Sequence, residues 1–374
     1  SAQLLVKTAE ADLYPFFPDL LVFYVYGSHI EYENIIRRVR ERTTAEIVLQ
    51  TDHVTKDADL TEETNPAKLT PENWDAFMNH LFLPQTAQKY GALLLDQRTA
   101  WKHYLKDNGL PAKALLKDGV HLNDQGNFVM AEIVKAWLRV NPTGDDRAWT
   151  NLVRTFAVGR DLKWDGDNLK FEFEGNRIDA IAPPDVGETT PLEVWIDGAR
   201  PSAIPALRHF NRVSAFPNSN WPMLLRVQAE APLEIEDWTL TLTELSNDLK
   251  TVKFTLKGSK TGADGEGVST NRFVSRSRRI VLEPDDWNLG YCRQVFNRTL
   301  SQGTQIKWQV LPNFYDEFRP TRAKDPTFEN TITLAQGLGN GKHQLELRGK
   351  NASSLAALRV YRPPGLSARA EGKP

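Results

Sequence analysis

The chain has 374 residues, with 46 Lys and Arg, 48 Asp and Glu, 7 His, a single Cys and a formal net charge of −2 at pH 7. Its 40% hydrophobic and 25% charged residues exclude an intrinsically disordered chain. One cysteine excludes an internal disulfide scaffold, near-neutral charge gives no electrostatic reason to expect nucleic acid, and no apolar run approaches the ~20 residues that span a bilayer.

Apolar runs and helical patterns alternate over the first 142 residues. Leu20–Tyr26 is a continuous apolar run ending at Gly27, which is typical of a strand buried on both faces. Further strands are predicted at 45–50 and 92–96, and helices at 31–41, 71–78, 99–106 and 125–138. This order predicts an α/β region with a parallel sheet and flanking helices, where ligands bind beyond the carboxyl ends of the strands.

The helical pattern stops near Asn141-Pro142, and strict alternation of apolar and polar residues replaces it. Leu169-Lys-Phe-Glu-Phe-Glu174 predicts a strand with one buried face. Similar runs occupy 191–196, 224–229, 238–243, 252–256, 279–282, 305–310, 343–347 and 357–361. The region is predicted to be all-β, and its length favours two sandwiches over one.

One short stretch carries the clearest chemistry. Asp118 and His121 stand three residues apart, directly before a predicted helix. The imidazole is suited to act as a general base, and the carboxylate to fix its tautomer and stabilise the imidazolium. The alternative is an ordinary loop in which Asn123 or Asp124 caps the following helix.

The sequence Asp118-Gly-Val-His-Leu-Asn123, between the last strand of the β/α region and its final helix, resembles the closing block of the SGNH (GDSL-type) hydrolases. The resemblance implies that Asp118 and His121 belong to a Ser-His-Asp catalytic set. Tyr26-Gly-Ser-His29 resembles the family's third block, Gly-x-Asn, which implies oxyanion donors at Gly27 and His29. His29 stands where the family has Asn, so a structural surface histidine is the alternative there.

The family's first block, Gly-Asp-Ser, which carries the nucleophile, occurs nowhere in the sequence. The resemblance therefore covers about residues 1–140, as the later portion of such a domain. Three explanations remain: an N-terminal segment or second chain carries the serine, the protein is inactive, or another residue acts, such as Ser28 beside His29. We favour the first, because a sheet without its central strand would expose an unpaired edge and apolar surface.

Other candidates are weaker. Asp52 and His53 follow a strand end, so they are predicted either to contact substrate at the rim or to form a hydrogen-bonded loop pair. Asp264–Gly267 is interpreted as a hairpin turn rather than a calcium loop. The basic run Arg272–Arg279 is typical of a solvated strand face, with binding of an acidic glycan as the alternative. No His or Cys cluster has metal-ligand spacing, and no cofactor is expected.

Segments in the second half resemble the jelly-roll modules attached to carbohydrate-active SGNH esterases, at 173–181, 194–198 and 331–347. We therefore predict three domains: 1–142 as the later part of an SGNH-type hydrolase domain, 150–210 with 325–366 as a jelly-roll module, and 213–322 as an inserted β-sandwich.

The functional hypothesis is a carbohydrate esterase that hydrolyses O-acetyl or similar esters on a polysaccharide by a Ser-His-Asp mechanism. The alternatives are a non-catalytic glycan-binding protein with a degenerate hydrolase domain, and a glycosidase or lyase using His121 and Asp118. The expected partners are a polysaccharide or oligosaccharide and the segment that carries the nucleophile, with no nucleic acid and no membrane. A secreted or periplasmic bacterial location is expected.

Overall fold

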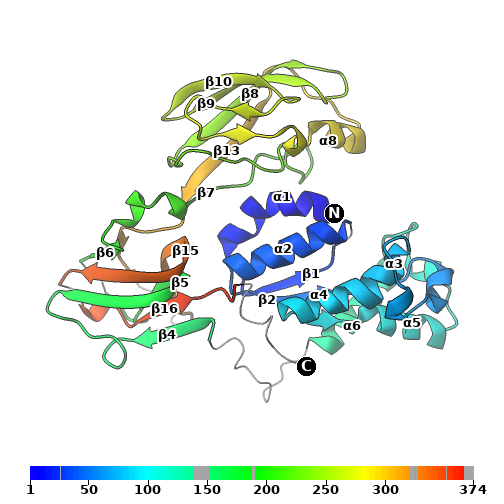
Figure 1. Ribbon diagram of the computed structural model, residues 1–374, viewed down its shortest axis with the longest axis horizontal. Helices are drawn as coiled ribbons and strands as arrows, with labels where there is room; N and C mark the ends of the chain where they lie inside the picture. The colour runs from blue at the N-terminus through cyan, green and yellow to red at the C-terminus, as the bar shows by residue number, and fades with distance from the viewer. Residues whose placement is uncertain are drawn as a thin grey trace. The chain divides into compact units, whose positions relative to one another are not determined.

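The structure is a computed structural model that describes residues 1–25, 27–138, 151–187, 190–320, 325, 327–350 and 352–365 (Figure 1). The chain divides into two compact units. The first, here called the α/β unit, consists of 1–3, 18–148 and 364–374, and the second, the β unit, of 4–17 and 149–363.

A three-stranded parallel sheet forms the centre of the α/β unit. Its strands are β1 (Leu20–Phe23), β2 (Glu46–Gln50) and β3 (Leu93–Leu95), in the order β1-β2-β3. The middle strand β2 is buried over four of its five residues, as its apolar sequence requires. The predicted α/β region with a parallel sheet is therefore present, although β1 ends three residues earlier than the predicted Tyr26, which lies outside the described residues.

Three helices of this unit begin at a side-chain cap. Ser28 caps α2, Asp96 caps α5 and Asn123 caps α6, each by accepting a backbone N–H three residues on. The elements are α2 (His29–Arg42), α3 (Trp74–Phe77), the π-helix η4 (Met78–Phe82), α4 (Leu83–Tyr90), α5 (Gln97–Asp107) and α6 (Asp124–Trp137), with short 3-10 turns η2 (Asp57–Thr61), η3 (Pro66–Lys68) and η5 (Ala112–Leu115).

The π-helix η4 has a local cause. Pro84, at the start of α4, has no N–H and cannot donate back along the helix. The preceding turn widens, and the N–H of Leu83 reaches the carbonyl of Met78 five residues earlier.

The β unit contains a six-stranded antiparallel sheet. Its longest strands, β5 and β15, pair from Asn330↔Ala182 to Arg348↔Asn168, and the sheet order is β14-β6-β15-β5-β16-β4. The strands are β4 (Val153–Ala157), β5 (Asn168–Ala182), β6 (Leu192–Ile196), β14 (Glu317–Phe318), β15 (Asn330–Arg348) and β16 (Ala357–Tyr361). Between β6 and β7 the chain forms the turns η6 (Pro201–Ala203) and η7 (Pro205–Leu207), and η9 (Ala352–Ser354) precedes β16.

A second antiparallel sheet in the β unit has its own core. It contains β7 (Arg208–Phe210), β8 (Asp237–Leu245), β9 (Val252–Gly258), β10 (Gly262–Val268) and β13 (Gln305–Pro312), in the order β10-β9-β8-β13-β7. Trp238 and Trp308 face each other across β8 and β13 and are buried with Cys292. These two tryptophans are therefore core residues rather than platforms for sugar rings.

The smaller elements of the β unit are the hairpin strands β11 (Phe273–Val274) and β12 (Val281–Leu282), the turn η8 (Pro284–Asp286) and helix α8 (Leu289–Phe296). The chain begins with α1 (Ala2–Asp12) and η1 (Tyr14–Phe16). The sequence analysis predicted neither α1 nor α8.

Three sequence interpretations in the β unit are wrong. Residues 224–229 make only isolated bridges, from Leu224 and Gln228. The predicted turn at Asp264–Gly267 lies inside β10, because Gly265 and Gly267 leave space for the ring of Phe273. The basic run is extended only at Phe273–Val274 and then turns back on itself. The predicted boundaries of the jelly-roll module and the inserted sandwich remain predictions, and residues 142–150 lie outside the described part of the chain.

Candidate active site

The loop between η5 and α6 holds Asp118 and His121 in direct contact. Nδ1 of His121 lies 2.8 Å from Oδ2 of Asp118. The other carboxylate oxygen accepts the backbone N–H groups of Val120 and His121 at 2.8 and 2.7 Å. One carboxylate therefore fixes both the imidazole ring and the backbone that carries it.

These bonds also set the charge of the pair. The N–H groups of His121 and Val120, followed by the His121 ring, hold the pKa of the Asp118 carboxyl well below its usual value. A carboxylate can only accept, so Nδ1 of His121 carries a proton, and Nε2 is the acceptor in the neutral ring. The His121 side chain is 71% exposed, and Nε2 has no hydrogen-bond partner in the part of the chain that the structure describes. This is the arrangement that a general base needs.

The connection between β1 and α2 contains Gly27 and Ser28, and His29 is the first residue of α2. Gly27 has φ +119°, a backbone conformation that residues with a Cβ rarely adopt, and a Cβ there would lie 3.1 Å from the backbone nitrogen of Ala2. Oγ of Ser28 accepts the N–H of Glu31 at 3.4 Å as the cap of α2. The ring of His29 meets the rings of Phe77 and Phe82 edge-on, at centroid distances of 5.2 and 5.5 Å.

Among the described residues no hydrogen bond joins Gly27, Ser28 or His29 to Asp118 or His121. Their proposed role in binding an oxyanion stays a prediction. The hydroxyl of Ser28 is engaged with the helix start, which fits a cap better than a nucleophile.

Asp52 and His53, predicted at the rim, are buried, with 9% and 4% of their surfaces exposed. The Tyr24 hydroxyl lies 2.9 Å from Oδ1 of Asp52 and 2.6 Å from Nδ1 of His53. Nε2 of His53 lies 2.9 Å from the carbonyl oxygen of Val120, inside the Asp118/His121 loop. Asp52 and His53 therefore both contact the Tyr24 hydroxyl, and the contact of His53 with Val120 joins the end of β2 to the candidate catalytic loop.

Several residues of this network were missed by the sequence analysis. The Arg98 side chain, 1% exposed, donates to the carbonyl of His53 at 3.0 Å and to both oxygens of Glu62. Oδ1 of Asn79 accepts the N–H of Asp52 at 2.6 Å. Arg98 alone had a signal in the sequence, because it follows the predicted strand 92–96 by two residues, where polar groups gather in a parallel sheet.

The outer strand β1 carries exposed apolar side chains. Leu20 is 46% and Val22 is 42% exposed, and Leu93 on β3, on the same face of the sheet, is 46% exposed. In α6 only Gly126 and Val129 are buried, and Phe128 is 60% exposed. An edge strand with apolar surface beside it is rare on a finished parallel sheet, whose faces are normally covered.

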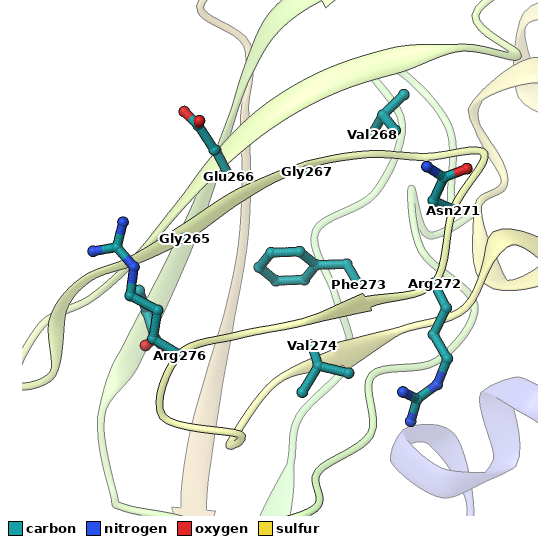
Figure 2. Close-up of a pocket in the computed structure, with 10 residues that line it drawn as sticks. Gly265, Glu266, Gly267, Val268, Asn271, Arg272, Phe273, Val274 and Arg276 are labelled. Carbon is teal, nitrogen blue, oxygen red and sulfur yellow. The ribbon is translucent and has the colours of Figure 1, made fainter.

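A separate hollow of about 420 Å³ lies in the β unit between β10 and the segment that leads into β11 (Figure 2). One of its two arginines, Arg272, is already paired with Glu230 and Glu283. Phe273 is 9% exposed and packs on Gly265 and Gly267, so its face is not free for a sugar. Asp264, which also lines the hollow, accepts from the backbone N–H and the hydroxyl of Ser277. Binding of an acidic glycan there stays a prediction.

Two features are absent from the residues that the structure describes. These residues contain no group of three His, Cys, Asp or Glu side chains that would hold a metal ion. None of their helices has the length and apolar character required to cross a membrane.

No family model and no curated protein matches the chain. Similar solved structures include the acetyl xylan esterase AlAXEase, at 18% identity over 37% of this chain and 76% of that one, with a TM-score of 0.30. Another is Axe2, an acetylxylan esterase from Geobacillus stearothermophilus, at 18% identity, 38% and 71% coverage and a TM-score of 0.29.

A two-domain esterase, CEX, active on acetylated mannans and co-crystallised with mannopentaose, matches 97% of this chain and 77% of its own length. Its identity is 13% and its TM-score 0.27. These likenesses, all with TM-scores of 0.27–0.30, carry no argument for function.

Proposed function

We propose that this protein is an ester hydrolase of the SGNH type that removes O-acetyl or similar groups from a polysaccharide. The observation that carries the proposal is the Asp118–His121 pair, with Nδ1 bound to an ionised carboxylate and Nε2 exposed. The polysaccharide substrate is proposed from the sequence resemblance to carbohydrate-active esterases, and a secreted or periplasmic location follows from such a substrate.

The chemistry would follow from this pair. A serine Oγ attacks the acetyl carbon while its proton passes to Nε2 of His121, and Asp118 stabilises the imidazolium. The imidazolium then gives that proton to the departing sugar oxygen as its bond to the acetyl carbon breaks. Water repeats the sequence on the acetyl-serine and releases acetate. Gly27, through its backbone N–H, and His29 would donate to the oxyanion.

The serine would come from an N-terminal segment or a second chain that adds a strand beside β1. Support comes from the position of β1 at the end of the sheet and from the exposed side chains of Leu20 and Val22. An unpaired strand edge is a template for another strand. A serine at the carboxyl end of that added strand would lie at the edge of the sheet where the Asp118/His121 loop is joined to β1 through Tyr24 and His53.

The test uses the protein together with the segment that carries the nucleophile. Acetylated xylan and acetylated glucomannan are suitable substrates, and free acetate is measured. His121→Ala should lower kcat for acetate release by about 100-fold or more. His103→Ala, which changes an exposed histidine on α5, is the matched control and should leave kcat unchanged.

The alternatives give different results. A glycosidase or lyase would release new sugar ends rather than acetate, and the release would depend on His121. A glycan-binding protein would bind the polysaccharide without releasing acetate or labelling with a serine-reactive phosphonate. Unchanged acetate release by His121→Ala would refute the esterase assignment.

A further inference from the structure

The loop that holds Asp118 and His121 has little support of its own. Residues 117–121 are all exposed, and Val120 is 47% exposed. Local bonds close the loop, from the N–H of Lys117 to the carbonyl of His121 at 2.9 Å. A fixed direction for the His121 ring therefore calls for a contact with the buried part of the unit.

His53 supplies that contact through a single peptide group. The carbonyl of Val120 accepts from Nε2 of His53, and the N–H of the same peptide, that of His121, donates to Asp118. In a trans peptide the C=O and N–H point in opposite directions. The peptide plane is thus fixed from both sides, and turning it would remove the N–H of His121 from the Asp118 carboxylate.

The hydrogen bond between Nε2 of His53 and the carbonyl of Val120 can have only one direction. A carbonyl oxygen only accepts, so Nε2 of His53 always carries the proton. The Tyr24 hydroxyl donates to Oδ1 of Asp52 and lies 2.6 Å from Nδ1 of His53. The bond from Nε2 to Val120 does not depend on the direction of the contact between Tyr24 and Nδ1.

His53 is itself held by buried groups. Nη1 of Arg98 donates to its carbonyl at 3.0 Å, and Asn79 accepts the N–H of Asp52 next to it. The ring of His53 packs against the fully buried ring of Trp101, with centroids 5.5 Å apart. Backbone, ring face and both ring nitrogens are therefore all fixed, so His53 has the rigidity that the exposed loop lacks.

We propose that His53 is a positioning residue that fixes the Val120–His121 peptide and so aims His121 at its substrate. The catalytic meaning of this role rests on the proposed esterase function, whereas the positioning itself does not. His53 lies 67 residues from Val120 in the chain.

The test is amide hydrogen exchange of this chain, read by NMR. In His53→Ala the amides of Val120 and His121 should exchange about tenfold faster, as expected when one partly buried hydrogen bond is lost. Exchange in β2 should stay as in the unsubstituted protein. His103→Ala is the control and should change neither region.

Two further variants separate the hydrogen bond from packing. The amide nitrogen of Gln reaches the place of Nε2, so His53→Gln should restore protection of the His121 amide. The shorter His53→Asn places its amide near Nδ1 and should not. In the unsubstituted protein, a slowly exchanging Nε2–H of His53, seen in the imidazole ¹⁵N spectrum, gives a readout that needs no substitution.

Equal protection in His53→Gln and His53→Asn would overturn the proposal, and so would a rapidly exchanging Nε2–H or unchanged exchange in a folded His53→Ala. In the protein with its nucleophile, His53→Ala should lower kcat and leave KM for the acetylated polysaccharide nearly unchanged. If the exchange results hold and no acetate is released by any form, the positioning role stands and the esterase function fails.

Discussion

Arg98 and Glu62 form a two-pronged ion pair in the α/β unit, with Nε–Oε1 and Nη2–Oε2 distances of 2.7 and 2.6 Å. Both side chains are buried, at 1% and 6% exposure. Because Arg98 also donates to the carbonyl of His53, this pair supports the backbone from which His53 reaches the candidate catalytic loop. The buried Glu62 carboxylate therefore contributes both to the stability of the unit and to the geometry of the site.

Glu62→Gln should destabilise the protein by about 3 kcal/mol, because it removes the closest counter-charge of the buried Arg98 guanidinium and leaves only the carboxylate of Asp59, 3.8 Å away. Urea unfolding followed by circular dichroism measures the change. Glu132→Gln, which removes an exposed partner of Lys135 on α6, is the control and should cost less than about 1 kcal/mol. Equal effects of the two substitutions would contradict the structural role of the pair.

The same carboxylate predicts how stability depends on pH. Burial raises the pKa of Glu62, but hydrogen bonds from Arg98, His80 and Lys102 outweigh it and leave the pKa well below its ordinary value. The unfolded chain, with a Glu pKa of about 4.3, therefore binds the proton first as the pH falls. The stabilisation is complete above about pH 5.5 and is lost as the pH falls below that range.

Unfolding free energies measured from pH 7 to pH 3 check this sign. The difference between the unsubstituted protein and Glu62→Gln should shrink by more than about 1 kcal/mol at pH 3. A difference that stayed constant, or grew, as the pH fell would show that Glu62 is not ionised through its partners in the folded protein.

Sequence reasoning found the parts of this site that are local. The Asp118–His121 contact spans three residues, and the spacing itself brings the two groups together. The contact between His53 and Val120 spans 67 residues. It depends on how β1, β2 and the loop pack together, and the periodicity of the sequence carries no information on that packing. The incorrect prediction at β10 has the same cause. The glycines of β10 predicted a turn, but the ring of Phe273 on β11 fills the space beside Gly265 and Gly267.

Gly27→Ala should destabilise the α/β unit by about 2 kcal/mol and lower acetate release in the protein with its nucleophile. The residue has φ +119°, and a Cβ would meet the Gln3 side chain and the backbone of Ala2. Gly109→Ala is the matched control, since Gly109 also has a positive φ, +60°, but open space around it. It should cost only about 1 kcal/mol. Thermal unfolding compares the two, and a larger cost at Gly109 would contradict the close approach at Gly27.

The exposed edge of β1 gives the last prediction. Val22→Lys places a charge on the strand edge where a nucleophile-bearing strand is proposed to pair, and edge lysines oppose such pairing. Acetate release should fall by about tenfold or more, while the amides of Val120 and His121 keep their exchange rates. Ile30→Lys, at a residue of α2 that is 61% exposed, is the control and should leave acetate release unchanged. If Val22→Lys is as active as Ile30→Lys, no strand pairs with this edge and the serine must reach His121 by another route.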